Sequence, residues 1–294
     1  MKDFIISVLN HESFDDRPPV LLDIGASGET FPAWKELITF AHCIAFEADD
    51  RELSALESTK GDWKQFTSFR SLATSESLDK LDFHLTKSPF CSSTLKPDNK
   101  SLADWEFASL FDVEKTVSLE TTNINKSLLD AGISYVDWFK TDSQGTDLRL
   151  FTSLPDRIRS KMLVADFEPG IIDAYLGEDK LHHILSHMDK EPFWVHSMDV
   201  KGAKRIIKDD LVGEEDARDK IIKKQKDSPC WCEISYLNDM KSDQLGLRES
   251  LLGWVFSTIL QQHGFALGIA RKWSSSSNDE IFGELIDYSL SKLS

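Results

Sequence analysis

The sequence predicts an α/β fold: a Rossmann-like, open, mostly parallel sheet with helices on both faces, followed by a C-terminal helical addition. Short apolar runs typical of buried strands alternate with segments of helical periodicity over the first 200 residues. Such alternation predicts a parallel sheet that is covered on both sides. We expect residues 1–200 to form the core, and residues 201–294 to form a mainly helical extension packed on it.

The first element of this pattern is a nucleotide-binding type of strand, turn and helix. Val20 to Ile24 predicts a short buried strand, and Gly25 and Gly28 allow a tight turn after it. A helix should follow, with the apolar face Phe31, Trp34, Leu37 and Ile38. The next strand, Cys43 to Phe46, ends on the acid Glu47. An acid about 20 residues after the glycines is placed to accept hydrogen bonds from ribose hydroxyls.

The glycine pattern favours one class of nucleotide. Dinucleotide-binding folds carry G-x-G-x-x-G, whereas the segment here is Asp23-Ile24-Gly25-Ala26-Ser27-Gly28. The acid before the glycines would repel a pyrophosphate but suits a ligand with an amino group or a sulfonium, such as S-adenosylmethionine (SAM). The plain alternative is that the glycines serve only the turn.

Composition excludes several other classes. The net charge of −16 argues against nucleic acid or anionic membrane as the main partner. No apolar stretch approaches the roughly 20 residues of a membrane span, and the N-terminus lacks the pattern of a signal peptide. The four cysteines form no metal-binding spacing, so we expect free thiols and a cytoplasmic location.

Further elements are expected along the chain. The segments that predict strands are 65–72, 81–85 (as part of a hairpin), 113–121, 136–141, 161–167 and 193–198. The segments that predict helices are 49–58, 123–131, 180–188, 209–226 (a charged surface helix), 247–263 (an amphipathic helix) and 280–293.

A second motif follows the strand Val136 to Thr141. Asp142 comes at the carboxyl end of this strand, and Gly145 permits the turn into a helix. In an open α/β sheet, ligands bind at the carboxyl ends of the strands. Asp142 and Glu47 should therefore face the same crevice.

Taken together, these motifs resemble the FkbM-type SAM-dependent methyltransferases. The segment from Lys140 to Leu148 is similar to the family's Lys-x-Asp-x-x-Gly-x-Asp/Glu-Leu pattern. The matching segments elsewhere are Leu22–Ala26, Ala45–Asp49, Ser92–Pro97 and Thr116–Leu129. The order and spacing agree over about residues 18–170, while Ser27 replaces a frequent Asn and Asp147 the commoner Glu. The resemblance implies a class I methyltransferase fold.

The resemblance also implies roles for individual residues. The residues expected to bind SAM, and its product S-adenosylhomocysteine, are Asp23, Gly25, Ala26, Gly28, Glu47, Ala48, Ser71 and Leu72. Asp142 is the candidate catalytic base, although it could instead ligate a metal, hydrogen-bond the substrate or cap the next helix. Lys140 is expected to orient Asp142 or a substrate oxygen; its plain alternative is a salt bridge. Ser92, Ser93 and Glu168 are expected near the substrate.

The implied reaction is methyl transfer to a hydroxyl oxygen of a sugar, a polysaccharide precursor or a secondary metabolite. The alternatives are a dinucleotide-dependent oxidoreductase of Rossmann type and a non-catalytic binding protein with a SAM fold. We name no metal-binding residues, since His182, His183 and His187 are more typical of an exposed helix than of a zinc site, and the sequence leaves open whether a divalent metal is needed. The C-terminal helices could cover the acceptor site or form a homodimer contact.

Overall fold

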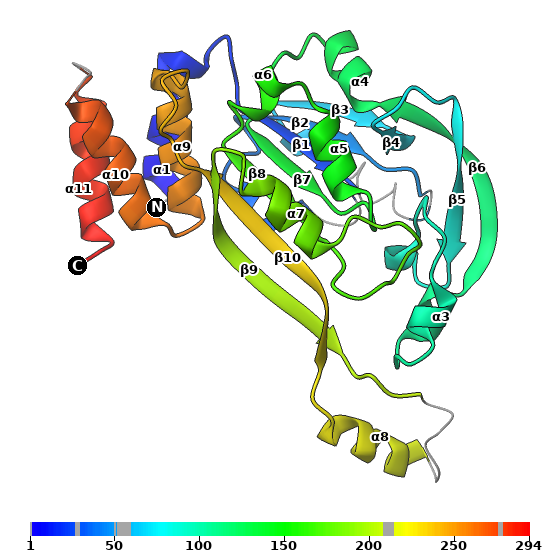
Figure 1. Ribbon diagram of the computed structural model, residues 1–294. Helices are drawn as coiled ribbons and strands as arrows, with labels where there is room; N and C mark the ends of the chain where they lie inside the picture. Colours follow the sequence, from blue (N-terminus) through cyan, green and yellow to red (C-terminus); the bar gives the residue numbers. More distant parts are fainter. Residues whose placement is uncertain (1, 27–29, 50, 52–59, 208–214, 276–278) are drawn as a thin grey trace.

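The main feature of the computed structural model is a mostly parallel sheet flanked by helices, which confirms the predicted α/β architecture (Figure 1). The structure describes residues 2–26, 30–49, 51, 60–207, 215–275 and 279–294. In this part of the chain, seven strands have the order β3-β2-β1-β7-β8-β10-β9. Their bounds are β1 Val20–Ile24, β2 His42–Phe46, β3 Gln65–Phe69, β7 Trp138–Thr141, β8 Val164–Phe167, β9 Phe193–Ala203 and β10 Ser228–Asn238.

Strand order reverses at the pair β1 and β7. The chain builds outward from β1 through β2 to β3, and then returns to the other side of β1 with β7 and β8. All four of these pairings are parallel, whereas β10 runs antiparallel to both β8 and β9. Such a switch point leaves a crevice at the carboxyl ends of the two central strands.

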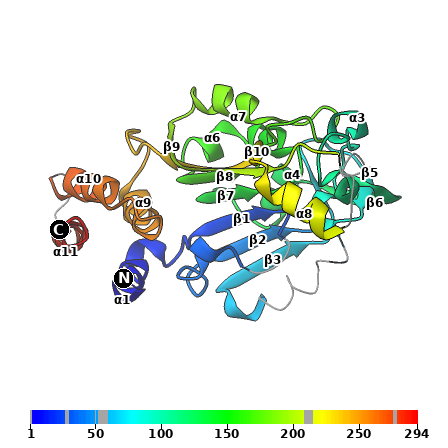
Figure 2. The ribbon, with the colours of Figure 1, turned by 90° about the horizontal axis from the view of Figure 1, so that it is seen from below.

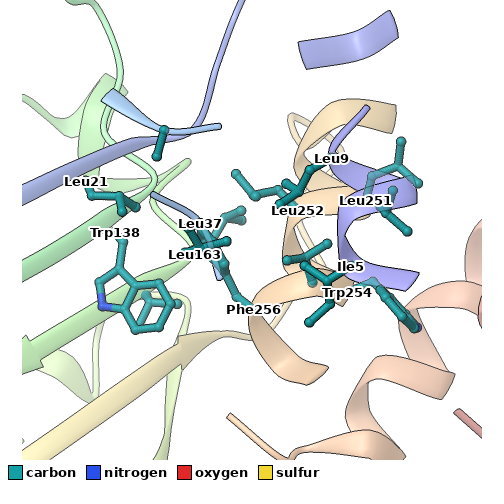
Figure 3. Close-up of a cluster of buried hydrophobic side chains, with 14 of the residues drawn as sticks. Ile5, Leu9, Leu21, Leu37, Trp138, Leu163, Leu251, Leu252, Trp254 and Phe256 are labelled. Atoms are coloured by element: carbon teal, nitrogen blue, oxygen red, sulfur yellow. The ribbon is translucent and has the colours of Figure 1, made fainter. Parts of the chain in front are cut away.

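Two apolar cores hold the layers together. On one face of the sheet, Phe139 and Phe167 pack against residues of α4–α7, such as Phe151. On the other face, Leu21 and Trp138 join a core that extends into α1, α9, α10 and α11 (Figure 3). The bounds of these helices are α1 Lys2–Leu9, α4 Ile124–Asp130, α5 Asp147–Ser153, α6 Asp156–Arg159, α7 Leu181–Met188, α9 Leu247–Ile259, α10 His263–Ser274 and α11 Ile281–Ser291.

A small second sheet lies at the opposite side of the molecule from helices α9–α11 (Figure 1). It has the order β4-β6-β5, from β4 (Leu72–Thr74), β5 (Lys80–Thr86) and β6 (Val113–Asn123). The expected hairpin strand is therefore β5, which pairs antiparallel with β6. The chain between them contains the short helix α3 (Asn99–Leu102) and supplies one wall of the candidate site described below.

The C-terminal part differs from the prediction. Residue 200 lies inside β9, and the unpredicted β10 lies within the main sheet, so the sheet continues beyond the expected boundary. Strands β9 and β10 project as a ribbon with α8 (Glu215–Lys224) at its tip (Figures 1 and 2). Along β10, Cys230, Cys232 and Ile234 alternate inward with half-buried or exposed residues. Only from Leu247 onward is the chain a helical extension.

Two expected helices differ from the prediction, and a third lies mostly outside the described residues. Within the described residues 30–40, the chain forms a 3₁₀ turn at Pro32–Trp34 and further turns in place of the expected helix, although Trp34 and Leu37 are fully buried as expected. The helix expected at 49–58 lies mostly outside the described residues. Helix α9 is not amphipathic, because α1 and α10 cover it and every residue from 248 to 258 is buried.

Arg248, on α9, links the helical block formed by α1 and α9–α11 to the amino ends of β1 and β7. Its guanidinium donates to both carboxylate oxygens of Asp137, at 2.8 and 2.7 Å, and both side chains are almost fully buried. The same group donates to the carbonyls of Arg17 and Pro18. Asp137 in turn accepts the backbone N–H of Val20 at 2.8 Å. No helix in the described residues is long and apolar enough to cross a membrane.

Replacing Arg248 with Met should destabilise the protein by about 3–5 kcal/mol, because Asp137 would be left buried without its charge partner. The free energy of unfolding would be measured by urea denaturation. The matched control is Arg17→Met, since Arg17 is half exposed and pairs with Glu249 on the same helix. That change should cost about 1 kcal/mol or less. Equal losses of unfolding free energy in the two variants would contradict the role given to the buried pair of Arg248 and Asp137.

Candidate functional site

Two adjoining cavities lie at the carboxyl ends of the central strands. The first cavity is bounded by the ends of β1, β2 and β7, which is the switch point of the sheet. Its lining residues are Ile24, Gly25, Phe46, Glu47, Ala48, Asp49, Ser71, Leu72, Ala73, Phe83, Pro89, Phe90, Ser92, Thr94, Asp142, Ser143, Gln144 and Thr146. None of these described residues is Lys or Arg, while three are acids, so the cavity is poorly suited to a pyrophosphate.

Gly25 brings the loops after β1 and β7 into close approach. It has φ +72°, and a Cβ atom on it would lie 2.1 Å from the carbonyl oxygen of Asp142. The backbone N–H groups of Gly25 and Ala26 both donate to the carbonyl of Phe46 at 3.1 Å. A side chain at position 25 is therefore excluded on two grounds, by conformation and by space.

Glu47 and Ser71 lie on one wall of the first cavity. Glu47 is buried at the end of β2, and its Oε1 accepts the backbone N–H of Asp49 at 2.7 Å. Ser71 follows β3, and its hydroxyl lies 2.6 Å from that of Thr122. Leu72, next to Ser71, adds an apolar surface to the same cavity. An acid, a hydroxyl and an apolar patch along one wall match the chemistry of ribose and adenine.

Lys140 is the charge that allows several carboxylates to coexist here. It lies opposite Asp23 in the parallel pairing of β1 and β7, and its Nζ donates to Asp23 Oδ1 at 2.7 Å. Burial alone would lower the pKa of Lys140, but the carboxylates of Asp23, Asp142 and Asp166 outweigh it and raise that pKa. Lys140 therefore stays charged and forms the salt bridge that was its plain alternative.

Asp142 lies between the two cavities and lines both. Burial raises the pKa of its carboxyl to about 6, against the opposing charge of Lys140. Gln144 donates from Nε2 to Asp142 Oδ1 at 2.6 Å, and its own Oε1 accepts from the hydroxyl of Tyr175 at 2.9 Å. Among the described residues nothing donates to Asp142 Oδ2, so that oxygen is available to a ligand.

The second cavity has a volume of about 520 Å³ and a largely aromatic wall. Its lining residues are Ser88, Phe90, Cys91, Phe107, Leu110, Phe111, Asp142, Gln144, Gly145, Glu168, Gly170, Ile172, Ala174, Tyr175, Glu178, Ala203, Cys230 and Trp231. Burial raises the pKa of Glu168 to about 8, helped by the nearby charges of Asp142 and Glu233. Burial likewise raises the pKa of Glu178 to about 7.

Asp147 joins the loops that carry Asp142 and Glu168. Its fully buried carboxylate accepts the backbone N–H of Ser143 at 3.0 Å and, through the other oxygen, the backbone N–H of Glu168 at 2.9 Å. It also accepts from the hydroxyl of Thr141. The acid at the end of the Lys-x-Asp motif therefore positions both cavities without lining either one.

The predicted site residues fall into two groups. Those that line a cavity are Gly25, Glu47, Ala48, Ser71, Leu72, Ser92, Asp142 and Glu168. Those that line neither cavity are Asp23, Ala26, Lys140 and Ser93, and Gly28 lies outside the described residues. Ser92 lines the first cavity rather than the second and accepts from Arg51 at 2.9 Å. Ser93 donates to the carbonyl of Gln144 at 2.7 Å, which supports that turn.

Several lining residues were not predicted. Gln144 has φ +54°, an uncommon backbone state for a residue other than glycine, and such states gather at functional sites. The signal in the sequence that could have identified Gln144 is its position between Asp142 and Gly145. Tyr175 and Trp231 come from a loop and from the unpredicted β10, so only the tertiary fold brings them to the cavity.

The three histidines His182, His183 and His187 form no group of metal ligands in the described part of the chain. The rings of His182 and His183 lie 4.0 Å apart, and His187 pairs with Glu191 at 3.2 Å. In the described part of the chain, no group of three or more His, Cys, Asp or Glu side chains could hold a metal ion. The four cysteines are free thiols.

Comparison with known proteins adds no family. The sequence matches no protein-family model, and no curated protein is significantly similar to it. The resemblance to FkbM-type methyltransferases therefore depends on the sequence motifs alone.

Replacing Glu168 with Gln should stabilise the protein at high pH. Because the folded-state pKa of Glu168 is about 8 against 4.5 for a free side chain, the folded protein holds this proton more tightly. Its contribution to stability is present below pH 4.5 and is lost as the pH rises through 8. Glu168→Gln should therefore raise the melting temperature by about 2 °C or more at pH 9, and change it little at pH 5.

The control for this measurement is Glu114→Gln, which removes the same charge from an exposed side chain on β6. Its effect on the melting temperature should be similar at both pH values. A melting temperature of Glu168→Gln that shows no greater difference between pH 5 and pH 9 than the control would refute the assigned burial.

Proposed function

We propose that the protein is a SAM-dependent O-methyltransferase that binds its cofactor in the first cavity and its methyl acceptor in the second. The observation that carries this proposal is the position of Asp142, which lines both cavities and has one carboxylate oxygen directed to neither Gln144 nor any other described donor. Methyl transfer requires two ligands whose reacting atoms meet, and Asp142 is placed where two such ligands would meet.

The first cavity fits SAM on several counts. Glu47 is suited to the ribose hydroxyls, and Ser71 and Leu72 to the adenine ring. Gly25 lets the backbone approach the ligand closely. The strand order also supports a class I methyltransferase fold, because β10 is antiparallel to its neighbours and lies next to the edge strand β9.

The chemistry assigns a role to each of the central side chains. Bound SAM would supply an electrophilic methyl group on a sulfonium. Asp142 holds the acceptor hydroxyl in line and accepts its proton as the O–CH₃ bond forms and the CH₃–S bond breaks. With a pKa of about 6, Asp142 is mostly ionised at neutral pH and is a stronger base than an ordinary aspartate. Lys140 and Gln144 position this carboxylate.

The acceptor class follows from the resemblance, which implies a hydroxyl on a sugar, a polysaccharide precursor or a secondary metabolite. The cavity of about 520 Å³ has room for a small molecule or for one residue of a glycan. The dinucleotide-dependent oxidoreductase is less well supported, since the first cavity has acids and no basic side chain among its described lining residues.

Binding of SAM is the first test. Calorimetry should show binding of SAM and S-adenosylhomocysteine, and no comparable binding of NAD. Glu47→Ala should weaken both SAM-type ligands by about tenfold or more, because it removes charge-assisted hydrogen bonds to the ribose. The control Glu114→Ala removes an exposed acid on β6 and should leave the affinity unchanged. Preference for NAD would instead support the oxidoreductase.

Asp142 is tested by separating binding from turnover. Asp142→Asn should bind SAM within about threefold of the wild type, while kcat with an acceptor found by screening should fall about 100-fold or more. The wild-type kcat should rise with pH through about 6, as the carboxyl ionises. Wild-type turnover by Asp142→Asn would exclude the proposed base. Loss of SAM binding in this variant would move Asp142 to the cofactor side.

A further inference from the structure

The electrostatic character of the second cavity is one-sided. Asp142, Glu168 and Glu178 all line it, and among its described lining residues there is no Lys, Arg or His. An acceptor that carries phosphate or carboxylate would meet only like charge there. The cavity therefore disfavours anionic acceptors, including phosphorylated sugars.

Glu168 is the acid in this cavity that lacks a partner among the described residues. No described group donates a hydrogen bond to its carboxylate or forms an ion pair with it, although its backbone N–H is bound by Asp147. By contrast, Glu178 accepts the backbone N–H of Ala174 at 2.8 Å and so supports its own loop. A half-buried carboxylate without a partner is costly, and a ligand cation would remove that cost.

The charged groups that face Glu168 reinforce this need. Asp142, Asp147 and Glu233 are acids, and they make the ionised form of Glu168 less favourable. Lys140 is the cation on that side, but its ammonium is bound to Asp23. The pKa of Glu168, raised to about 8 by burial and these acids, is consistent with a site that lacks its countercharge.

The aromatic side chains complete the description of the acceptor. Phe107, Phe111 and Tyr175 form a continuous wall, with ring centroids 5.6 Å apart for the first pair and 5.5 Å for the second. Trp231 lines the same cavity from β10. Phe90 is 66% exposed and lines both cavities. Such rings bury apolar ligand surface and attract organic cations through their faces.

We propose that the methyl acceptor is a hydroxylated amine, whose protonated nitrogen binds the carboxylate of Glu168 while its apolar body packs against the aromatic wall. This inference rests on the proposed function for the identity of the second ligand. An organic cation is favoured over a metal ion, because no described cluster of side chains could hold one. The hydroxyl is then presented to Asp142, which lines the same cavity.

Three probes that share a phenol ring but differ in charge test this inference. Tyramine is cationic, 4-ethylphenol is neutral and 4-hydroxyphenylacetate is anionic. Calorimetry on the full chain at pH 8.5 should show tyramine binding about tenfold more tightly than 4-ethylphenol, with the anion weakest. Tyramine should also bind more tightly at pH 8.5 than at pH 6.5, since Glu168 must ionise to bind it.

The variants locate the effect. Glu168→Gln should bring the tyramine and 4-ethylphenol affinities to within about twofold of each other, by loss of tyramine binding alone. Glu114→Gln, which removes an exposed charge on β6 outside the cavity, should keep the tenfold preference. A preference that survives in Glu168→Gln, equal binding of the anion, or no binding of tyramine at millimolar concentration would each overturn the inference.

These results are distinguishable from a failure of the proposed function. If SAM binds and tyramine is not preferred, the acceptor class is wrong while the cofactor proposal stands. If tyramine binds through Glu168 and neither SAM nor S-adenosylhomocysteine binds, the amine site stands and the methyltransferase proposal fails.

Discussion

The ion pair between Lys140 and Asp23 is the interaction on which the organisation of the site depends. It crosses from β7 to β1 at the switch point of the sheet, next to the first cavity. Asp142 and Asp166 also lie within the influence of the same ammonium. Without that charge, carboxylates on three adjacent strands would repel one another in a region shielded from water. Lys140 thus makes an acidic site compatible with a folded sheet.

The amino and carboxyl ends of the strands differ in how fully their buried charges are paired. At the amino ends, Arg248 and Asp137 form a buried and fully hydrogen-bonded junction with the helical block. At the carboxyl ends, the carboxylates of Asp142 and Glu168 line the cavities; Asp142 accepts one hydrogen bond, from Gln144, and Glu168 has no described partner. Under the proposed function, stability and ligand binding belong to opposite ends of the same strands, as is usual for open α/β sheets.

Local signals explain what could be predicted from the sequence. Val20–Ile24 is an apolar run, interrupted by Asp23, that stands before a glycine, and such a run is typical of a central parallel strand. The positions of Glu47 and Asp142 follow from the same reasoning, since each ends such a strand. The strand-helix alternation was enough to predict the mostly parallel sheet.

What could not be predicted depends on contacts between distant segments. Strand β10 has a proline near its start and follows a highly charged helix, so its alternation is a weak signal. Its place between β8 and β9 is set by the partners and not by its own residues. Tyr175 and Trp231 reach the second cavity for the same reason, and the isolation of Glu168 is visible only once the surrounding acids are placed.

The bridging carboxylate of Asp147 has a consequence for how the two cavities behave together. One oxygen holds the backbone at Ser143, in the first cavity, and the other holds the backbone at Glu168, in the second. If the loop at Ser143 or the loop at Glu168 is displaced, the other loop must therefore move with it or a buried hydrogen bond must break. Under the proposed function, occupancy of one cavity changes the affinity of the other, and thermodynamic linkage makes that effect reciprocal. In such an enzyme, Asp147 would couple binding of the cofactor to binding of the acceptor.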